Sequence, residues 1–182
     1  MTISASQFSK ARLGGTPCPP DVALLLAKCS DVLSDAGVEI SPESAWAPWA
    51  DKSYLTATDL KDPDIAANVK AIDDTFAGIT FIAKTDEGEC IGYWRGPEGR
   101  PIESSPVVSY DTEGQFRLCG GRFVESLFFL IYDEDVLAKI RTVFAEAGSP
   151  LSFASIDEIE IPSVPCTPAA FHLSRYKAYK QA

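Results

Sequence analysis

The single histidine of this chain, His172, follows Cys166 by six residues. A cysteine nucleophile activated by a histidine base is the pair that many hydrolases use, provided that a third group orients the base. Here the two residues flank Pro168 in a proline-rich segment, with no obvious third group beside them. We favour an unrelated cysteine and histidine, and we keep a Cys166/His172 hydrolase as an alternative.

Grouped carboxylates are the second set of residues that could do chemistry, because they can act as acid and base or bind a metal. Two of these groups fall at expected helix starts, where capping explains them. No calcium-loop pattern, phosphate-binding glycine loop or Gly-Lys-Ser/Thr motif occurs in the sequence. We therefore expect no catalytic, cofactor-binding or metal-binding residue among the four groups: Asp62/Asp64, Asp73/Asp74, Asp133/Glu134/Asp135 and Asp157/Glu158/Glu160.

The cysteines are odd in number and scattered, without a Cys-x-x-Cys pair, which argues against a disulfide framework and a zinc site. Free cysteines of this kind are usually small buried residues, and that is what we expect for most of them. They are Cys18, Cys29, Cys90, Cys119 and Cys166.

The formal charge of −10 is unevenly distributed over the 182 residues. Residues 1–160 hold all 26 acidic and 13 of the 16 basic residues, a net charge of −13, whereas residues 161–182 carry three bases and no acid. Such a chain is poorly suited to bind nucleic acid, whose phosphates require Lys and Arg. The charge suits a basic protein partner, and solubility alone is the simpler interpretation.

No apolar run is long enough to span a bilayer, and the first ten residues lack the basic and apolar regions of a signal peptide. We expect a cytoplasmic protein without a membrane partner. With 46% hydrophobic and 23% charged residues, the composition is typical of one folded domain covering residues 1–182.

The N-terminal half predicts helices. Residues 1–18 should form a loose lead-in, Pro19-Pro20-Asp21 should start a helix that ends at Gly37, and Ser41-Pro42-Glu43 should start a short one interrupted by Pro48. Residues 50–62 should be a loop. Apolar residues at helical spacing predict a further helix from Asp62 to Gly78.

The middle of the chain predicts two β-hairpins. Runs of β-type residues over 79–84 and 89–94 flank a Thr-Asp-Glu-Gly turn, and runs over 106–110 and 115–119 flank an Asp-Thr-Glu-Gly turn. Helices should follow from Arg122 to Ile131 and from Asp133 to Gly148. A late strand is expected over Ile156–Ile161, and residues 162–182 should form a stiff, proline-rich basic tail. This order predicts an α+β fold with a hairpin-built, mixed or antiparallel sheet flanked by helices.

The aromatic residues near the first hairpin and in the region before it allow two interpretations. Trp46, Trp49, Tyr93 and Trp94 could anchor a contact surface, since Trp and Tyr often do so. We favour the core for Trp46 and Trp49. Arg95 leaves a strand into a loop and should be exposed.

The segment Phe81–Tyr132 resembles the SUKH superfamily, the group of Smi/Knr-type cell-wall regulators and bacterial toxin-immunity proteins. The resemblance covers under a third of the chain and concerns structural motifs, including a helix that reads Phe-Val-Glu-Ser-Leu where the family has Phe-x-x-Phe-Leu. The residues that carry it are Ile79–Ala83, Ile91–Trp94, Pro106–Val108 with Tyr110-Asp111, and Phe123–Leu130.

The resemblance implies a non-enzymatic protein that binds a partner, and in bacterial members the partner is often a nuclease or deaminase toxin that the protein neutralises. A basic toxin would suit the acidic charge of this chain. The expected contact residues are at the hairpin ends and in the loop after the first hairpin: Asp86, Glu87, Glu89, Arg95 and Glu113. A regulatory or scaffolding module of the same fold is the alternative, and a Cys/His or carboxylate-dependent hydrolase is the third.

Overall fold

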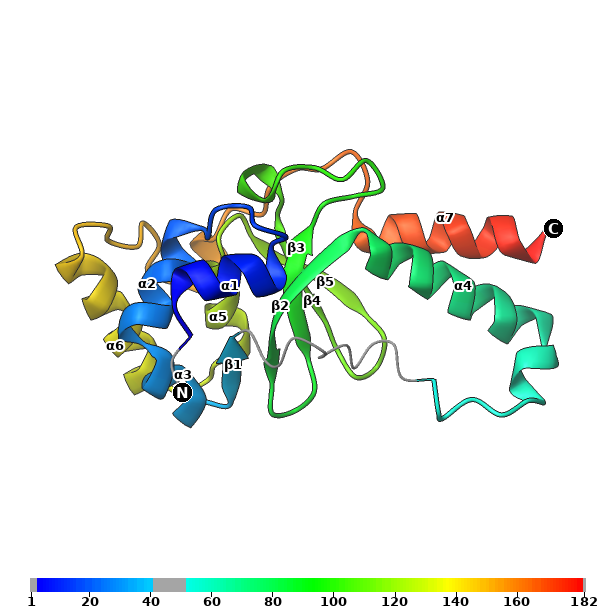
Figure 1. Cartoon of the computed structure of the whole chain (residues 1–182), viewed down its shortest axis with the longest axis horizontal. Helices are drawn as coiled ribbons and strands as arrows, with labels where there is room; N and C mark the ends of the chain where they lie inside the picture. The colour runs from blue at the N-terminus through cyan, green and yellow to red at the C-terminus, as the bar shows by residue number, and fades with distance from the viewer. Residues whose placement is uncertain (1–2, 41–51, 182) are drawn as a thin grey trace.

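The structure is a computed structural model, which describes residues 3–40 and 52–181. Within these ranges the chain has an α+β fold with seven α-helices and one open, five-stranded antiparallel sheet (Figure 1). The expected α+β class is confirmed, and the sheet is antiparallel throughout.

The strands follow one another across the sheet in chain order, so that each pairs with its sequence neighbours. The two predicted hairpins are confirmed as β2–β3 and β4–β5. The first strand was not predicted, because it has three residues directly after Gly37 and lacks a pattern of its own. The strands are β1 (Val38–Ile40), β2 (Ile79–Thr85), β3 (Cys90–Trp94), β4 (Val107–Tyr110) and β5 (Phe116–Gly120).

Five helices pack beside one face of the sheet and form the larger part of the core (Figure 1). Ile91, Tyr93 and Val107 reach this core from the sheet, since alternate residues of a strand point to the same face. The helix after the last strand, α5, is nearly all apolar and is buried as expected. The five are α1 (Ala5–Arg12), α2 (Pro20–Lys28), α3 (Ser30–Asp35), α5 (Phe123–Leu130) and α6 (Glu134–Glu146).

The remaining two helices, α4 (Pro63–Ala77) and α7 (Pro168–Lys180), lie side by side and extend away from the sheet as an antiparallel pair (Figure 1). At its base this pair covers a second apolar cluster, in which the rings of Trp94 and Phe171 are 5.8 Å apart. Along the pair, an ion pair of 2.8 Å joins Asp64 to Lys180. The predicted helix from Asp62 to Gly78 is confirmed as α4.

The prediction of a loose N-terminal segment is wrong. Ser4 and Gln7 form a capping box that starts α1, and Phe8 on that helix is completely buried. A single large apolar residue, Phe8, gave too weak a periodic signal to reveal the helix. The next predicted helix is divided at Cys29, which leaves the helical conformation between α2 and α3.

The two C-terminal predictions are also wrong. Ile156–Glu158 form a 3₁₀ turn, η4, instead of starting a strand. Residues 168–180 form α7 instead of an extended tail, because Pro168 occupies the first helical position, where proline is well tolerated, and Thr167 caps the Ala170 amide at 3.2 Å. Only residues 162–167 of the predicted tail lack helix or strand.

The connecting segments hold two more 3₁₀ turns, η2 (Asp59–Lys61) and η3 (Ile102–Ser104). The short helix expected at Ser41–Glu43, and with it Trp46 and Trp49, lies outside the described residues. None of the helices described is both long and apolar enough to cross a membrane.

Candidate functional site

The turns of the two hairpins lie beside each other. Cys90, at the start of β3, pairs with Tyr110, at the end of β4, so both turns lie at the same end of the sheet. A Cβ atom placed on Gly88 would lie 3.2 Å from Cγ2 of Thr112. Figure 1 shows the two turns at the lower edge of the sheet. Four of the five predicted contact residues therefore belong to one surface.

This surface carries more acids than the sequence indicated. Asp86, Glu87 and Glu113 are exposed and Glu89 is half-buried. Asp86 also lies beside α3 and β1, where it lines a cavity of about 340 Å³ together with Asp31 and Glu39. We call the six residues the acidic end: Asp31, Glu39, Asp86, Glu87, Glu89 and Glu113.

Few positive charges neutralise the acidic end. Lys84 forms an ion pair with Glu39 at 3.1 Å. Among the described residues, no ion pair involves the other five carboxylates. Glu113 accepts a hydrogen bond from the side-chain amide of Gln115 at 3.3 Å, which leaves its charge in place. Five of the six carboxylates of the acidic end are thus outside any ion pair in the described part of the chain, and four of these, Asp31, Asp86, Glu87 and Glu113, are exposed.

The two turns hold their shape through local hydrogen bonds. The Asp111 carboxylate accepts from the backbone amides of Glu113 and Gln115 at 3.0 and 2.8 Å, which is an Asx-type turn. Gly88 and Gly114 have φ angles of +93° and +84°, a backbone region that suits glycine. The carboxylates are therefore carried by turns with fixed backbones.

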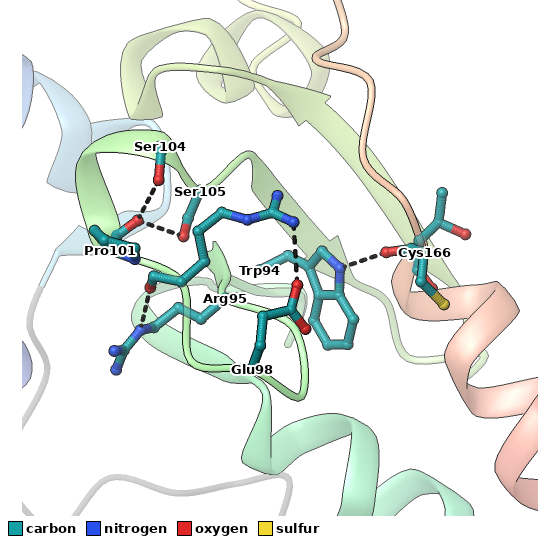
Figure 2. Close-up of polar contacts among 9 residues, drawn as sticks. Trp94, Arg95, Glu98, Pro101, Ser104, Ser105 and Cys166 are labelled. Atoms are coloured by element: carbon teal, nitrogen blue, oxygen red, sulfur yellow. Dashed lines mark hydrogen bonds and ion pairs between the residues drawn. The ribbon is translucent and has the colours of Figure 1, made fainter.

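Arg95 does not belong to the acidic end. It follows β3 at the opposite end of the sheet, where its guanidinium donates to the carbonyl of Arg100 at 2.8 Å (Figure 2). The guanidinium also donates to the carbonyl of Gly99 at 3.0 Å. The side chain is half-buried and folds the loop onto itself. This arrangement gives Arg95 a structural role in the 95–105 loop.

Trp94 and Tyr93 are core residues. Trp94 is 1% exposed, and its indole nitrogen donates to the carbonyl oxygen of Cys166 at 2.8 Å (Figure 2). Tyr93 is 2% exposed on the other face of the sheet. Neither contributes an aromatic surface for a partner.

The structure gives Cys166 and His172 separate partners. His172 pairs with the side-chain oxygen of Asn68 at 3.0 Å, and burial lowers the pKa of its imidazole. The Cys166 thiol lies 3.6 Å from the Thr167 carbonyl. No hydrogen bond between the cysteine and the histidine exists in the described part of the chain.

The four carboxylate groups have structural roles at most positions. Asp62 and Asp133 cap α4 and α6, as expected. Asp64, Asp73 and Asp74 pair with Lys180, Lys52 and Arg175. The Glu158 carboxylate accepts from the Ala154 amide at 2.7 Å. Within residues 3–40 and 52–181, no group of three or more His, Cys, Asp or Glu side chains is arranged to hold a metal ion.

Sequence reasoning missed Asp31 and Glu39 because their contribution depends on packing. Glu39 belongs to the unpredicted β1, which pairs Glu39 with Lys84 of β2. The sequence signal that could have revealed this strand was the alternation of apolar Val38, acidic Glu39 and apolar Ile40 directly after Gly37. Asp31 sits on α3 and reaches this surface because α3 packs against β1.

In comparisons with known proteins, the chain matches no protein-family model, no curated protein and no solved structure.

Proposed function

We propose that this protein is a non-enzymatic immunity protein of the SUKH type, which binds and neutralises a basic toxin through the acidic end. The observation that carries the proposal is the position of the two turns beside each other, with the Thr112 side chain next to Gly88. It gathers Asp86, Glu87, Glu89 and Glu113 into one surface, although 27 positions separate the first and last of them. The toxin's class, a nuclease or deaminase, comes from the resemblance.

The charge of the acidic end supports a basic partner. Surfaces of one sign attract oppositely charged partners over a distance and raise the rate of productive encounter. Toxins that act on nucleic acids need basic surfaces to hold phosphates, so an acidic protein that covers such a surface would block access to the substrate. Asp86, Glu87 and Glu113 are exposed and can reach a partner without rearrangement.

The rigidity of the turns also supports a binding role. Association costs less when the contact residues are already ordered, because less conformational entropy is lost. Here the Asp111 carboxylate fixes the second turn, and the Asp86 amide donates to the Gly37 carbonyl at 2.8 Å, which fixes the first turn against the end of α3. Both turns are joined to strands whose inward side chains are buried.

The test begins with the proteins encoded next to this one. Each neighbouring protein is co-expressed with this chain, and any pair that co-purifies is measured by isothermal titration calorimetry. We expect one neighbour to bind below micromolar concentration and to lose its toxicity in the complex. Failure of every neighbouring toxin to bind at micromolar concentration would contradict the proposal.

The acidic end is then tested with two matched triple variants. One neutralises Asp86→Asn, Glu87→Gln and Glu113→Gln; the control neutralises three exposed acids elsewhere, Glu146→Gln, Asp157→Asn and Glu160→Gln. Both remove three negative charges. We expect the first to weaken binding at least tenfold and the control to weaken it less than threefold. Equal losses would show that overall charge, and not the acidic end, governs binding.

The same experiment addresses a regulatory or scaffolding module as the alternative function. A module of that kind would bind a neighbour that has no toxic activity, with the same dependence on Asp86, Glu87 and Glu113. Growth of cells that express the neighbour alone separates the two functions, because a toxin arrests growth in the absence of its immunity protein.

A further inference from the structure

A second candidate site lies at the end of the sheet opposite the acidic end. A cavity of about 570 Å³ opens between the start of α2, the end of β3, η3 and the end of α6, within the size range of small-molecule sites. Its walls are mostly apolar. The residues that matter to its chemistry are Asp21, Leu24, Tyr93, Ile102, Arg122 and Phe144.

Tyr93 brings an unused hydrogen-bonding group to this cavity. The residue is 2% exposed, and its hydroxyl has no hydrogen-bond partner among the described residues. Buried hydroxyls in folded proteins nearly always have a partner, so the Tyr93 hydroxyl has hydrogen-bonding capacity that a bound molecule can use. Burial raises the pKa of Tyr93 well above its usual value, and the charge of Asp21 contributes to this shift. The phenol is neutral at physiological pH and its oxygen is able to accept a hydrogen bond.

Asp21 supplies a buried carboxylate to the same cavity. It is 6% exposed, and its Oδ2 atom accepts from the backbone amide of Val124 at 3.0 Å. This is the one hydrogen bond of its side chain within the described part of the structure, whereas a carboxylate has about four acceptor positions. Asp21 thus retains acceptor capacity in the cavity that the Tyr93 side chain also lines.

The remaining walls define what else a ligand would meet. Phe144, Leu24 and Ile102 are apolar, and the Arg122 guanidinium carbon lies 5.7 Å from the centre of the Phe144 ring. Glu103 is exposed and also lines the cavity. Its charged lining residues are therefore two carboxylates and one guanidinium, so the cavity carries a net negative charge.

We propose that this cavity binds a small primary amine with an aromatic or aliphatic body. Its ammonium group donates to the free acceptor positions of Asp21 and to the oxygen of Tyr93, since an ammonium has three donors and no acceptor. Its body packs against Leu24, Ile102 and Phe144. A carboxylate ligand would bring a second negative charge to Asp21. The site is separate from the acidic end and does not depend on the toxin-binding proposal.

Three probes with the same phenyl body and different end groups test the proposal: 2-phenylethylamine, 2-phenylethanol and phenylacetate. Each is titrated into the full-length protein at pH 7 and followed by calorimetry and by the NMR signal of the Val124 amide, which is bonded to Asp21. We expect 2-phenylethylamine to bind at least tenfold tighter than 2-phenylethanol and to shift the Val124 signal. We expect phenylacetate not to bind. Equal binding of all three probes, or no binding of the amine at millimolar concentration, overturns the proposal.

Two conservative variants test which side chains contact the ammonium group of the amine. Tyr93→Phe removes only the hydroxyl and should weaken the amine about three- to tenfold, the range of one hydrogen bond. Asp21→Asn keeps an oxygen for the Val124 amide, removes the charge, and should weaken the amine more than tenfold. Tyr132→Phe, at a side chain that is 90% exposed, is the matched control.

Thermal unfolding separates loss of the site from loss of the fold. Tyr93→Phe should unfold at the wild-type temperature or above it, because it deletes a buried hydroxyl without a partner. Unchanged amine affinity in a folded Tyr93→Phe protein contradicts the proposed contact with the hydroxyl.

Discussion

The indole nitrogen of Trp94 donates a hydrogen bond of 2.8 Å to the carbonyl oxygen of Cys166. This bond connects the end of β3 to the residue two positions before α7, across 72 residues of sequence. Because Trp94 is 1% exposed and its ring also contacts Phe171, it fixes the base of α7 on the sheet. The C-terminal helix is thus held by a residue of the central hairpin.

Replacing Trp94 by Phe should destabilise the protein by about 2–4 kcal/mol, because it removes buried ring atoms and leaves the Cys166 carbonyl without its donor. Urea unfolding measures the loss. Hydrogen exchange should also speed up in α7 more than in α2. Leu173→Ala, at a side chain of α7 that is 49% exposed, is the control and should change stability by less than about 0.5 kcal/mol.

Gly92 in β3 should not tolerate a methyl group. A Cβ atom at this position would lie 2.5 Å from the Thr80 carbonyl oxygen and 2.7 Å from the Phe81 Cα atom, and both belong to the backbone of the neighbouring strand. We expect Gly92→Ala to cost about 1–3 kcal/mol in urea unfolding. Gly121→Ala is the comparison, since its closest contact is the Pro162 side chain at 3.3 Å. An equal cost for both variants would contradict this explanation.

Much of the fold was predictable because its signals are local. The Thr-Asp-Glu-Gly and Asp-Thr-Glu-Gly turns between β-type runs identified both hairpins, and Asp62 and Asp133 marked the starts of α4 and α6. The helix α7 was missed because its polar and apolar residues show little helical periodicity, and its position depends on contacts with Trp94 and α4. Contacts of this kind, between residues far apart in the chain, cannot be predicted from a single sequence.

The stability of the folded protein should decrease at acidic pH when Asp74 becomes protonated. Desolvation is the largest influence and acts to raise its pKa, yet hydrogen bonds from Tyr179 and Arg175 and the charge of Arg175 lower the pKa overall. A carboxylate whose pKa is lower when folded stabilises the folded state above its unfolded pKa of about 3.9, and this contribution is lost as pH falls further. The side chain is partly exposed, which makes the effect small.

The measurement is urea unfolding between pH 6 and pH 2.5 for the wild type and Asp74→Asn. We expect the difference in stability between the two proteins to shrink as pH falls through the range below 4. Asp73→Asn, at the neighbouring carboxylate on α4, is the control for charge removal. A difference that stays constant over this range would show that Asp74 ionisation does not hold α7 to α4.

Cys18 should react slowly with alkylating reagents. Burial first, and then the charge of Asp21, raise the pKa of its thiol to about 11. At pH 8 roughly one Cys18 thiol in a thousand is then the reactive thiolate, so the alkylation rate should keep rising up to pH 11. Peptide mass spectrometry after iodoacetamide treatment measures this rate. Asp21→Asn should increase it, and a rate that levels off near pH 8.5 in the wild type would contradict the shift.

The candidate sites were only partly visible in the sequence. The turn acids Asp86, Glu87 and Glu113 could be named because charged residues in hairpin turns are exposed, but their meeting depends on the pairing of β3 with β4. Asp21 was interpreted as part of a helix start, which is correct, whereas Tyr93 was left open between a contact surface and the core, and the structure places it in the core. Their shared cavity arises because α2 packs against α5 and the sheet, which no local pattern encodes.

The most direct test of the central claim is the salt dependence of the association rate between this protein and its toxin partner. Stopped-flow rates at 20 mM and 200 mM salt are compared for the wild type, the variant neutralised at Asp86, Glu87 and Glu113, and the control neutralised at Glu146, Asp157 and Glu160. We expect the wild-type and control rates to fall about tenfold or more with added salt, and the rate of the first variant to be slow and nearly independent of salt. The same steep dependence in both triple variants would contradict a binding role for the acidic end.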